Sequence, residues 1–226
     1  MTVFDRRSLM GLAALAAAGP ALATEPPAAA TPFTPAVLPF DPKALGWLSE
    51  KLITSHHDNN YMGAVKRLGS IEAQLSGLDM TTAAGFLLNG LKREELIAWN
   101  SMILHELYFA GLGATGKPDG RLAAAIEHDF GSDARWRAEF LAMGKALGGG
   151  SGWVLLTWSA RDRRLVNQWA SDHTQSMAGA TPILALDMYE HAYAMDFGAK
   201  AGTYVDAFMG GVGWSNANRL FAKLAA

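Results

Sequence analysis

The spacing of apolar residues changes at Gly148-Gly149-Gly150, and this change limits the folds that the chain can adopt. Before the glycines, apolar residues recur every three or four positions over residues 42–76 and 92–112, which predicts two long helices. After them, residues 153–159 and 164–171 are rich in aromatic and β-branched residues and flank a polar turn, which predicts a β-hairpin.

Shorter patterns complete the expected architecture. Residues 184–187 form a short apolar run that predicts a third strand, and residues 122–130, 132–146 and 200–225 have helical patterns. The predicted fold class is α+β. An N-terminal two-helix hairpin is followed by a C-terminal domain of helices around a small three-stranded antiparallel sheet. The predicted domain boundaries are residues 37–115 for the hairpin and residues 116–226 for the C-terminal α/β domain.

The beginning of the chain has the pattern of an export signal. Arg6-Arg7 precedes the apolar run 11–19, and Ala21-Leu22-Ala23 is a possible cleavage site. Residues 1–23 are therefore predicted to be a twin-arginine signal peptide, and the alternative is an ordinary secretory signal with a chance arginine pair. Residues 24–36 are rich in Pro and Ala, which predicts a spacer. We expect the twin-arginine machinery to deliver the protein to the periplasm or otherwise outside the cytoplasm.

Composition narrows the possible functions. Half of the 226 residues are apolar and the formal net charge is −2, which lacks the basic surplus of a nucleic-acid binder. The chain has no cysteine, so disulfides and thiolate metal ligands are excluded. Beyond the signal, we find no apolar run long enough for a stable membrane span.

Histidines are few, and their positions point to a metal site. Of six histidines, His191 lies four residues after Asp187, and His56, His57 and His105 lie upstream. Three imidazoles and one carboxylate suit redox iron or manganese. Less specific explanations are a surface Asp–His pair on a helix and a buried, hydrogen-bonded core histidine. The apolar run before Asp187 favours a buried carboxylate, which needs a compensating cation.

Four motifs give this pattern a family resemblance. They are Val37-Leu38-Pro39-Phe40, Gly150-Ser151-Gly152-Trp153, Asp187-Met188-Tyr189-Glu190-His191-Ala192-Tyr193 and Val212-Gly213-Trp214. In this order they resemble the iron/manganese superoxide dismutases, with Tyr189 where the family usually has Trp. The resemblance extends from about residue 33 to the C-terminus. It implies an enzyme that converts superoxide to dioxygen and hydrogen peroxide by alternate reduction and oxidation of one bound metal ion.

The resemblance also implies the roles of individual residues. It selects His56 over His57, with His105, Asp187 and His191, as ligands of one iron or manganese ion per subunit. His173 occupies a position from which the family's Gln or His bonds the metal-bound solvent, and this histidine favours iron by analogy. Trp153 is expected to wall the metal site. Glu190 is expected to bond a ligand histidine across the interface of a homodimer, although a tetramer is also possible.

The predicted entrance to the site departs from the family. Where the family has a gateway His and Tyr, four and eight residues after the first ligand, this chain has Asn60 and Ala64. Ala194 replaces a Tyr that reaches in from the opposite subunit, and Tyr61 is expected to face elsewhere. The funnel should therefore be wider and wetter. The alternatives to a dismutase are an exported, weakly active or non-catalytic metal-binding protein on the same scaffold and, third, peroxide chemistry.

Overall fold

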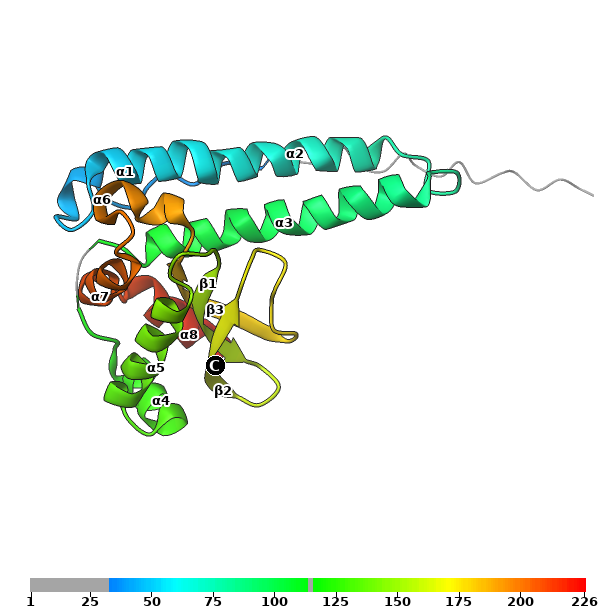
Figure 1. The fold of residues 1–226 in the computed structure, drawn as a ribbon. Helices are drawn as coiled ribbons and strands as arrows, with labels where there is room; N and C mark the ends of the chain where they lie inside the picture. Colours follow the sequence, from blue (N-terminus) through cyan, green and yellow to red (C-terminus); the bar gives the residue numbers. More distant parts are fainter. Residues whose placement is uncertain (1–32, 114–115) are drawn as a thin grey trace, which may run out of the picture.

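The computed structural model describes residues 33–113 and 116–226, and it confirms the α+β fold class (Figure 1). Two long helical rods lie antiparallel, and the other helices pack with a small sheet near one end of this hairpin. The predicted signal peptide and most of the predicted spacer lie outside the described residues. The elements in chain order are η1 (Pro42–Ala44), α1 (Glu50–Ser55), η2 (His56–Tyr61), α2 (Met62–Ser76), α3 (Gly85–Ala110), α4 (Gly120–Phe130), α5 (Asp133–Ala146), β1 (Trp153–Ser159), β2 (Arg164–Ala170), β3 (Ala180–Asp187), η3 (Glu190–Ala192), α6 (Ala194–Phe197), α7 (Ala201–Gly211) and α8 (Ser215–Leu224).

The first rod is one continuous run, but it is not the single α-helix expected over residues 42–76. A short 3₁₀ turn, η1, stands apart from it, and α1 begins after Ser49, whose hydroxyl accepts a hydrogen bond from Leu52 N at 3.1 Å. η2 is a π-helix, after which α2 continues. Gly63 lies inside regular α2, so the irregular turn of this rod is η2 and not the glycine.

The second rod, α3, begins at Gly85, earlier than the predicted residue 92. Gly85 and Gly90 lower the helix propensity of these first turns, and the sequence pattern therefore did not predict them. Buried side chains of α2 and α3 belong to the same hydrophobic core as those of the sheet. The hairpin therefore holds the site-bearing ends of both rods against the C-terminal domain.

The sheet has the strand order β2-β1-β3, and both pairings are antiparallel. All seven residues of the central strand β1 are buried, as expected for a strand covered on both faces. β3 begins at Ala180 rather than at residue 184. Its first half contains Pro182, which an edge strand tolerates but which made the strand harder to predict. In the β1–β3 register, Trp153 lies opposite Asp187. The strand ends thus bring two predicted site residues together.

The other helices follow their predicted boundaries closely, with one exception. Gly131 ends α4 with a φ of 85°, and Ser132 caps α5 by accepting from Arg135 N at 3.1 Å. The helix expected over residues 200–225 is two helices, α7 and α8, because the backbone becomes extended at Val212. Among the described helices, none is long and apolar enough to cross a membrane.

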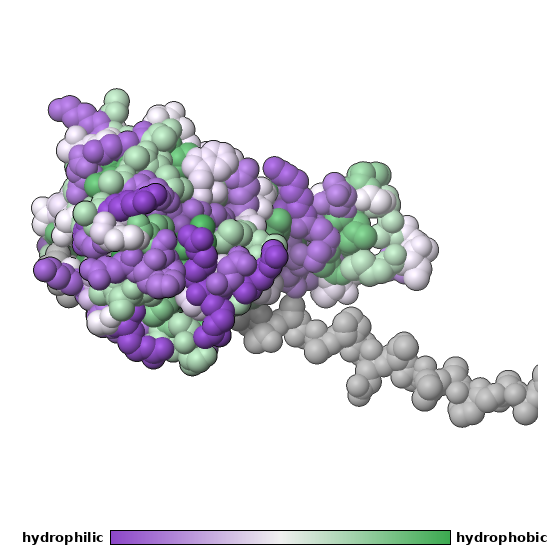
Figure 2. Space-filling model, turned by 90° about the horizontal axis from the view of Figure 1, so that it is seen from below, coloured by the Kyte–Doolittle hydropathy of each residue, from purple (hydrophilic) through white to green (hydrophobic). Residues whose placement is uncertain are grey.

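The surface is mostly mixed in polarity. Figure 2 shows hydrophilic side chains over most of one face, while hydrophobic side chains gather at the far end of the hairpin. Met80 and Phe86, near the turn between α2 and α3, are 55% and 84% exposed. This end of the hairpin lies away from the sheet and from the residues that form the candidate site (Figure 1).

Candidate metal centre

Four side chains from four separate elements converge on one point. His56 begins η2, His105 lies in α3, Asp187 ends β3 and His191 lies in η3. Their donor atoms all lie within 4.8 Å of one another. Asp187 Oδ2 lies 3.2 Å from His56 Nε2, 3.6 Å from His105 Nε2 and 3.3 Å from His191 Nε2. The structure therefore brings together the four residues that the resemblance selected.

Local structure fixes the orientation of Asp187. The four residues directly before it in β3 are buried, and its own side chain is fully buried. Its other oxygen, Oδ1, accepts a hydrogen bond from Tyr189 N at 2.8 Å. One oxygen is thus held by the backbone and the other faces the three imidazoles.

His105 is oriented by its own helix. Its Nδ1 lies 2.6 Å from the carbonyl oxygen of Ser101, one turn earlier in α3. A carbonyl oxygen only accepts, so Nδ1 carries the proton and Nε2 presents a lone pair to Asp187 and the other imidazoles. This is the arrangement that metal-binding histidines usually have.

Burial and charge set the protonation of the cluster. Burial lowers the pKa of His56 below its ordinary value and lowers the pKa of His105 to about 3. Burial by itself would raise the pKa of Asp187, but the neighbouring imidazoles, His191 foremost, hold that pKa well below its usual range. Two neutral imidazoles and an ionised carboxylate are the protonation states that metal ligands require.

Two buried imidazole nitrogens of the cluster are in position to bind a further group. Among the described residues, the Nε2 atoms of His56 and His105 are buried and have no hydrogen-bond partner. Each such atom costs about 1–3 kcal/mol if it is left unsatisfied. A cation bound by both nitrogens and by Asp187 would remove this cost and neutralise the buried charge. The donor set therefore fits a metal ion with nitrogen and oxygen ligands.

A second layer of aromatic groups lies beside the cluster. Trp153 Nε1 donates a hydrogen bond to His173 Nδ1 at 3.0 Å, and the rings of His173 and His105 are 6.1 Å apart. Tyr189 stacks on His173 at 4.8 Å and on His191 at 5.3 Å. Burial raises the pKa of Tyr189 to about 12, so it stays a neutral phenol at physiological pH.

Sequence reasoning missed three aromatic residues of the site. The ring of His56 lies 5.2 Å from that of Tyr108 and 5.0 Å from that of Phe109. Tyr204 donates a hydrogen bond to the carbonyl oxygen of Asp187 at 2.9 Å. Phe109 could have been found, because it lies four residues after His105 and so shares its helix face. Tyr204 carried no local signal, since α7 reaches the site only through the tertiary fold.

The predicted entrance residues lie in η2 and just after it. Asn60 lies in η2, which is a π-helix, and Ala64 lies in the first turn of α2. Ala64 is buried in the hydrophobic core. Tyr61 is 1% exposed, and its ring lies 6.3 Å from that of Phe109, which contacts the His56 ring. The ring of Phe109 therefore lies between Tyr61 and the cluster.

Other histidines lie outside the cluster. His57 has one ring nitrogen 2.8 Å from Asp58 Oδ1 and the other 3.1 Å from the Ala36 carbonyl oxygen. The His128 side chain is 87% exposed, and its Nδ1 lies 2.8 Å from Asp129 Oδ1. Both rings therefore make these contacts outside the metal centre.

Comparison with known proteins agrees with this geometry. The family described as iron/manganese superoxide dismutases, C-terminal domain, matches residues 118–220. The chain is 70% identical to a "Superoxide dismutase [Fe]" of Cupriavidus metallidurans over 77% of this chain and 89% of that protein. The chain belongs to the iron/manganese superoxide dismutase family. It is also 35% identical to a "Superoxide dismutase [Mn] 1" of Halobacterium salinarum, over 79% of this chain and 88% of that protein. A "Superoxide dismutase [Fe]" of Aquifex pyrophilus is 30% identical, over 78% and 85%. Relatives named for either metal thus share this superoxide dismutase scaffold.

The metal-free protein should lose stability as the pH falls from about 6.5 toward 3. His105 has an ordinary pKa of 6.5 when unfolded and about 3 when folded, so in this window the unfolded chain binds a proton that the folded chain does not. Each such group makes stability fall by up to about 1.4 kcal/mol per pH unit. Urea unfolding of the metal-free protein at several pH values measures this slope.

The variant His105→Gln isolates the effect, because it removes the titrating ring. Its unfolding free energy should depend less steeply on pH than that of the wild type. The matched control His128→Gln changes an exposed histidine and should keep the wild-type slope. Equal slopes for wild type and His105→Gln would contradict the prediction.

Proposed function

We propose that the protein is a superoxide dismutase that uses one iron or manganese ion, with iron favoured. The observation that carries the proposal is the group of three imidazole Nε2 atoms around one buried carboxylate oxygen. Membership of the superoxide dismutase family supplies the reaction, and the 70% identity to a protein named for iron favours that metal. Superoxide is the substrate, and dioxygen and hydrogen peroxide are the products.

His56, His105, Asp187 and His191 are the residues proposed to hold the ion. When bound, the ion supplies one-electron chemistry, because it can accept an electron from one superoxide and give an electron to the next. The three imidazoles are uncharged ligands and Asp187 contributes a single negative charge. The site therefore keeps a net positive charge that attracts an anionic substrate.

His173 is proposed to hold a proton for the reaction. Two protons are consumed for every two superoxide ions, so donors near the site are required. Trp153 donates to Nδ1 of His173, and the neutral ring therefore carries its proton at Nε2. Asn100 donates to the carbonyl oxygen of His173, which fixes the loop. The stacked ring of Tyr189 limits rotation of the imidazole.

A weakly active metal-binding protein is the second candidate. It is suggested by Asn60 and Ala64, because neither provides the imidazole or the phenol that the family resemblance leads one to expect there. The two candidates share the metal site and differ only in turnover. Measuring bound metal and superoxide removal on one preparation separates them, since the second candidate gives stoichiometric metal with little activity.

Replacing Asp187 with Ala should remove both metal and activity. The variant takes away the only anionic ligand and leaves three imidazoles around an uncompensated cation. Changes in residues that merely orient metal ligands cost about 10–100-fold in affinity or activity, so loss of a ligand should exceed 100-fold, roughly. Elemental analysis and a superoxide-removal assay measure the two effects after separate reconstitution with iron and with manganese.

The matched control is Glu127→Ala, which removes an exposed carboxylate of α4. It should bind metal and remove superoxide like the wild type. A wild type no more active than Asp187→Ala with either metal would eliminate the dismutase. Full metal loading in that inactive wild type would favour the second candidate.

We also propose a two-fold dimer in which Glu190 of each copy bonds His191 of the other. Glu190 is exposed and the His191 side chain is 25% exposed, although His191 belongs to the metal cluster. In the part of the chain that the structure describes, the Nδ1 atom of His191 has no hydrogen-bond partner. A carboxylate from a second copy would satisfy it.

Glu190→Ala should weaken the dimer and release the metal faster. The wild type is expected to have twice the mass of one chain in light scattering, and the variant should shift toward the monomer on dilution. Glu127→Gln, which changes an exposed carboxylate elsewhere, should leave the mass unchanged. A variant that remains as dimeric as the wild type would exclude Glu190 as the cross-link.

Export to the periplasm by the twin-arginine machinery remains part of the proposal. It is supported by Arg6-Arg7 and by the apolar run that follows. Replacing both arginines with lysine should leave the full-length protein in the cytoplasm, whereas an ordinary secretory signal tolerates this change because it needs only positive charge. Cell fractionation and the mass of the exported chain decide between the two signals.

A further inference from the structure

We propose that Tyr61 and Glu106 form a hydrogen-bonded brace that sets the distance between the two metal-site histidines of the hairpin, His56 and His105. Tyr61 would then be a positioning residue, which acts through the ligands without touching the metal. This inference rests on the metal site proposed above. Each of its steps uses contacts of the described residues.

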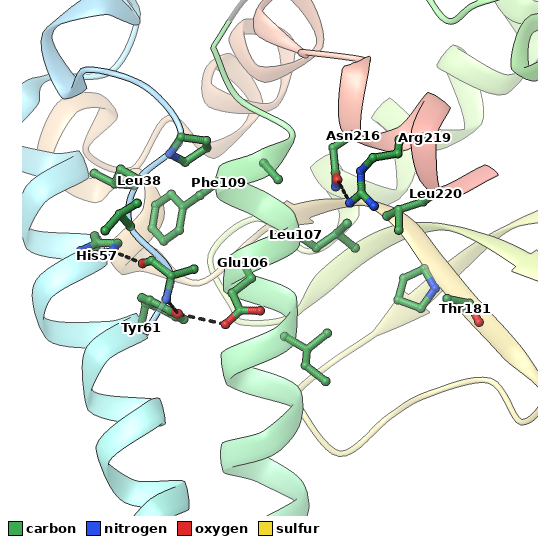
Figure 3. A pocket seen from close by; sticks show the side chains of 16 residues that line it. Leu38, His57, Tyr61, Glu106, Leu107, Phe109, Thr181, Asn216, Arg219 and Leu220 are labelled. Atoms are coloured by element: carbon green, nitrogen blue, oxygen red, sulfur yellow. Dashed lines mark hydrogen bonds between the residues drawn. The ribbon is translucent and has the colours of Figure 1, made fainter. Parts of the chain in front are cut away.

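The brace connects the two rods where they carry their ligands. Tyr61 is the last residue of η2, the π-helix that His56 begins, and Glu106 directly follows His105 in α3. The Tyr61 hydroxyl donates a hydrogen bond to Glu106 Oε1 at 2.9 Å (Figure 3). Consecutive residues of an α-helix point about 100° apart, so His105 faces the cluster while Glu106 faces η2. The two rods are thus joined twice near the metal site, by the bond between Tyr61 and Glu106 and by the contacts of His56 and His105 with Asp187.

Two hydrogen bonds fix the position of the Tyr61 hydroxyl. Besides donating to Glu106, it accepts a hydrogen bond from Ala36 N at 2.5 Å. Burial is the main cause that raises the pKa of Tyr61 to about 12, so the phenol keeps the proton that it donates to the carboxylate. The carbonyl of Ala36 is held in turn by His57 at 3.1 Å. Both polar backbone groups of Ala36 are thus bound to η2.

A cavity lies beside the brace. The cavity measures about 460 Å³ and is lined in part by His57, Tyr61, Glu106 and Phe109 (Figure 3). Phe109 also contacts the ring of His56, so one ring lies between the cavity and the cluster. The rest of the lining comes from residues 36–39, α3, β3 and α8, so this face of α3 is not closely packed against those elements. The hydrogen bond from Tyr61 holds Glu106, on the same face, to η2.

The π-helix makes the brace possible. In a regular α-helix, a residue five positions after His56 would be rotated about 140° from it, because each residue turns by about 100°. The wider π turn brings the fifth residue back toward the same side. Tyr61 can therefore reach Glu106 beside His105, while His56 still points into the cluster.

Replacing Tyr61 with Phe tests the brace in the metal-loaded protein. The ring keeps its packing against Phe109 and His57, whereas the hydrogen bond to Glu106 and the one from Ala36 N are both lost. We expect a strong chelator to remove the metal about tenfold faster than from the wild type, as when a group that orients metal ligands is lost. We also expect the electron paramagnetic resonance signal of the ferric form to change shape, since the ligand geometry changes.

Two further variants of the partner keep the test informative. Glu106→Gln retains an oxygen that accepts from Tyr61, so metal release should stay close to the wild-type rate. Glu106→Ala lacks this oxygen and should behave like Tyr61→Phe. The double variant Tyr61→Phe with Glu106→Ala should be no worse than Tyr61→Phe alone, because that change has already removed the bond to Glu106.

A matched control separates the brace from general loosening of the hairpin. Arg67 of α2 and Glu94 of α3 form an ion pair that also joins the two rods, but farther from the ligands. Arg67→Gln should leave the metal release rate and the ferric signal unchanged.

The outcomes separate this inference from the proposed function. If Tyr61→Phe releases metal no faster than Arg67→Gln, or if the two brace variants are additive, the brace is wrong. A wild type that binds no metal at all would instead overturn the proposed function.

Discussion

The structure depends on one buried carboxylate. Asp187 has no exposed surface, and a lone buried charge is very unfavourable. His56, His105 and His191 reach it from three other elements, and their Nε2 atoms lie where a bound cation would contact them together with the carboxylate and so compensate its charge. The hairpin, the end of the sheet and the turn after it must therefore be in their native places together. The contacts of these four side chains are therefore both a requirement of the fold and the metal site itself.

The sheet register explains why Asp187 arrives with its neighbours already ordered. Trp153 lies opposite Asp187 in the β1–β3 pairing, and Met188 N donates to Gly152 O just beyond it. A slip of β3 by one residue would turn Asp187 to the opposite face. The hydrogen bond from Trp153 to His173 depends on the other pairing, in which Trp153 lies opposite Ala170 at the end of β2. Strand pairing thus positions a ligand and a proton-holding group at once.

The sequence predicted those features that rest on local periodicity or on a motif. The hairpin, the strand pair and the cap at Ser132 follow from spacing and turn chemistry, and the four cluster residues followed from the family resemblance. The π-helix was not predictable in this way, because apolar spacing over six residues does not distinguish a repeat of four from a repeat of five. The irregular turn is where Asn60 and Tyr61 lie, so the side chains of these residues could not be oriented from the sequence. Tyr204 was missed because 17 residues separate it from Asp187, and its contact depends on how η3, α6 and α7 fold back on the end of β3.

The two sides of the cluster have different tasks. On the side of Phe109, the polar groups of His57 and Tyr61 are bound to Ala36 and neighbouring carboxylates, so their hydrogen bonds stabilise the hairpin. On the side of Tyr189, the rings are partly exposed, and the neutral His173 ring holds a proton at the nitrogen that Trp153 does not bind. The exposed part of the cluster therefore lies at His191, whose side chain is 25% exposed, on the side of the proposed proton-holding residue His173. The fold thus opens the cluster on the side of the sheet and encloses it on the side of the first helix, where His56 is fully buried.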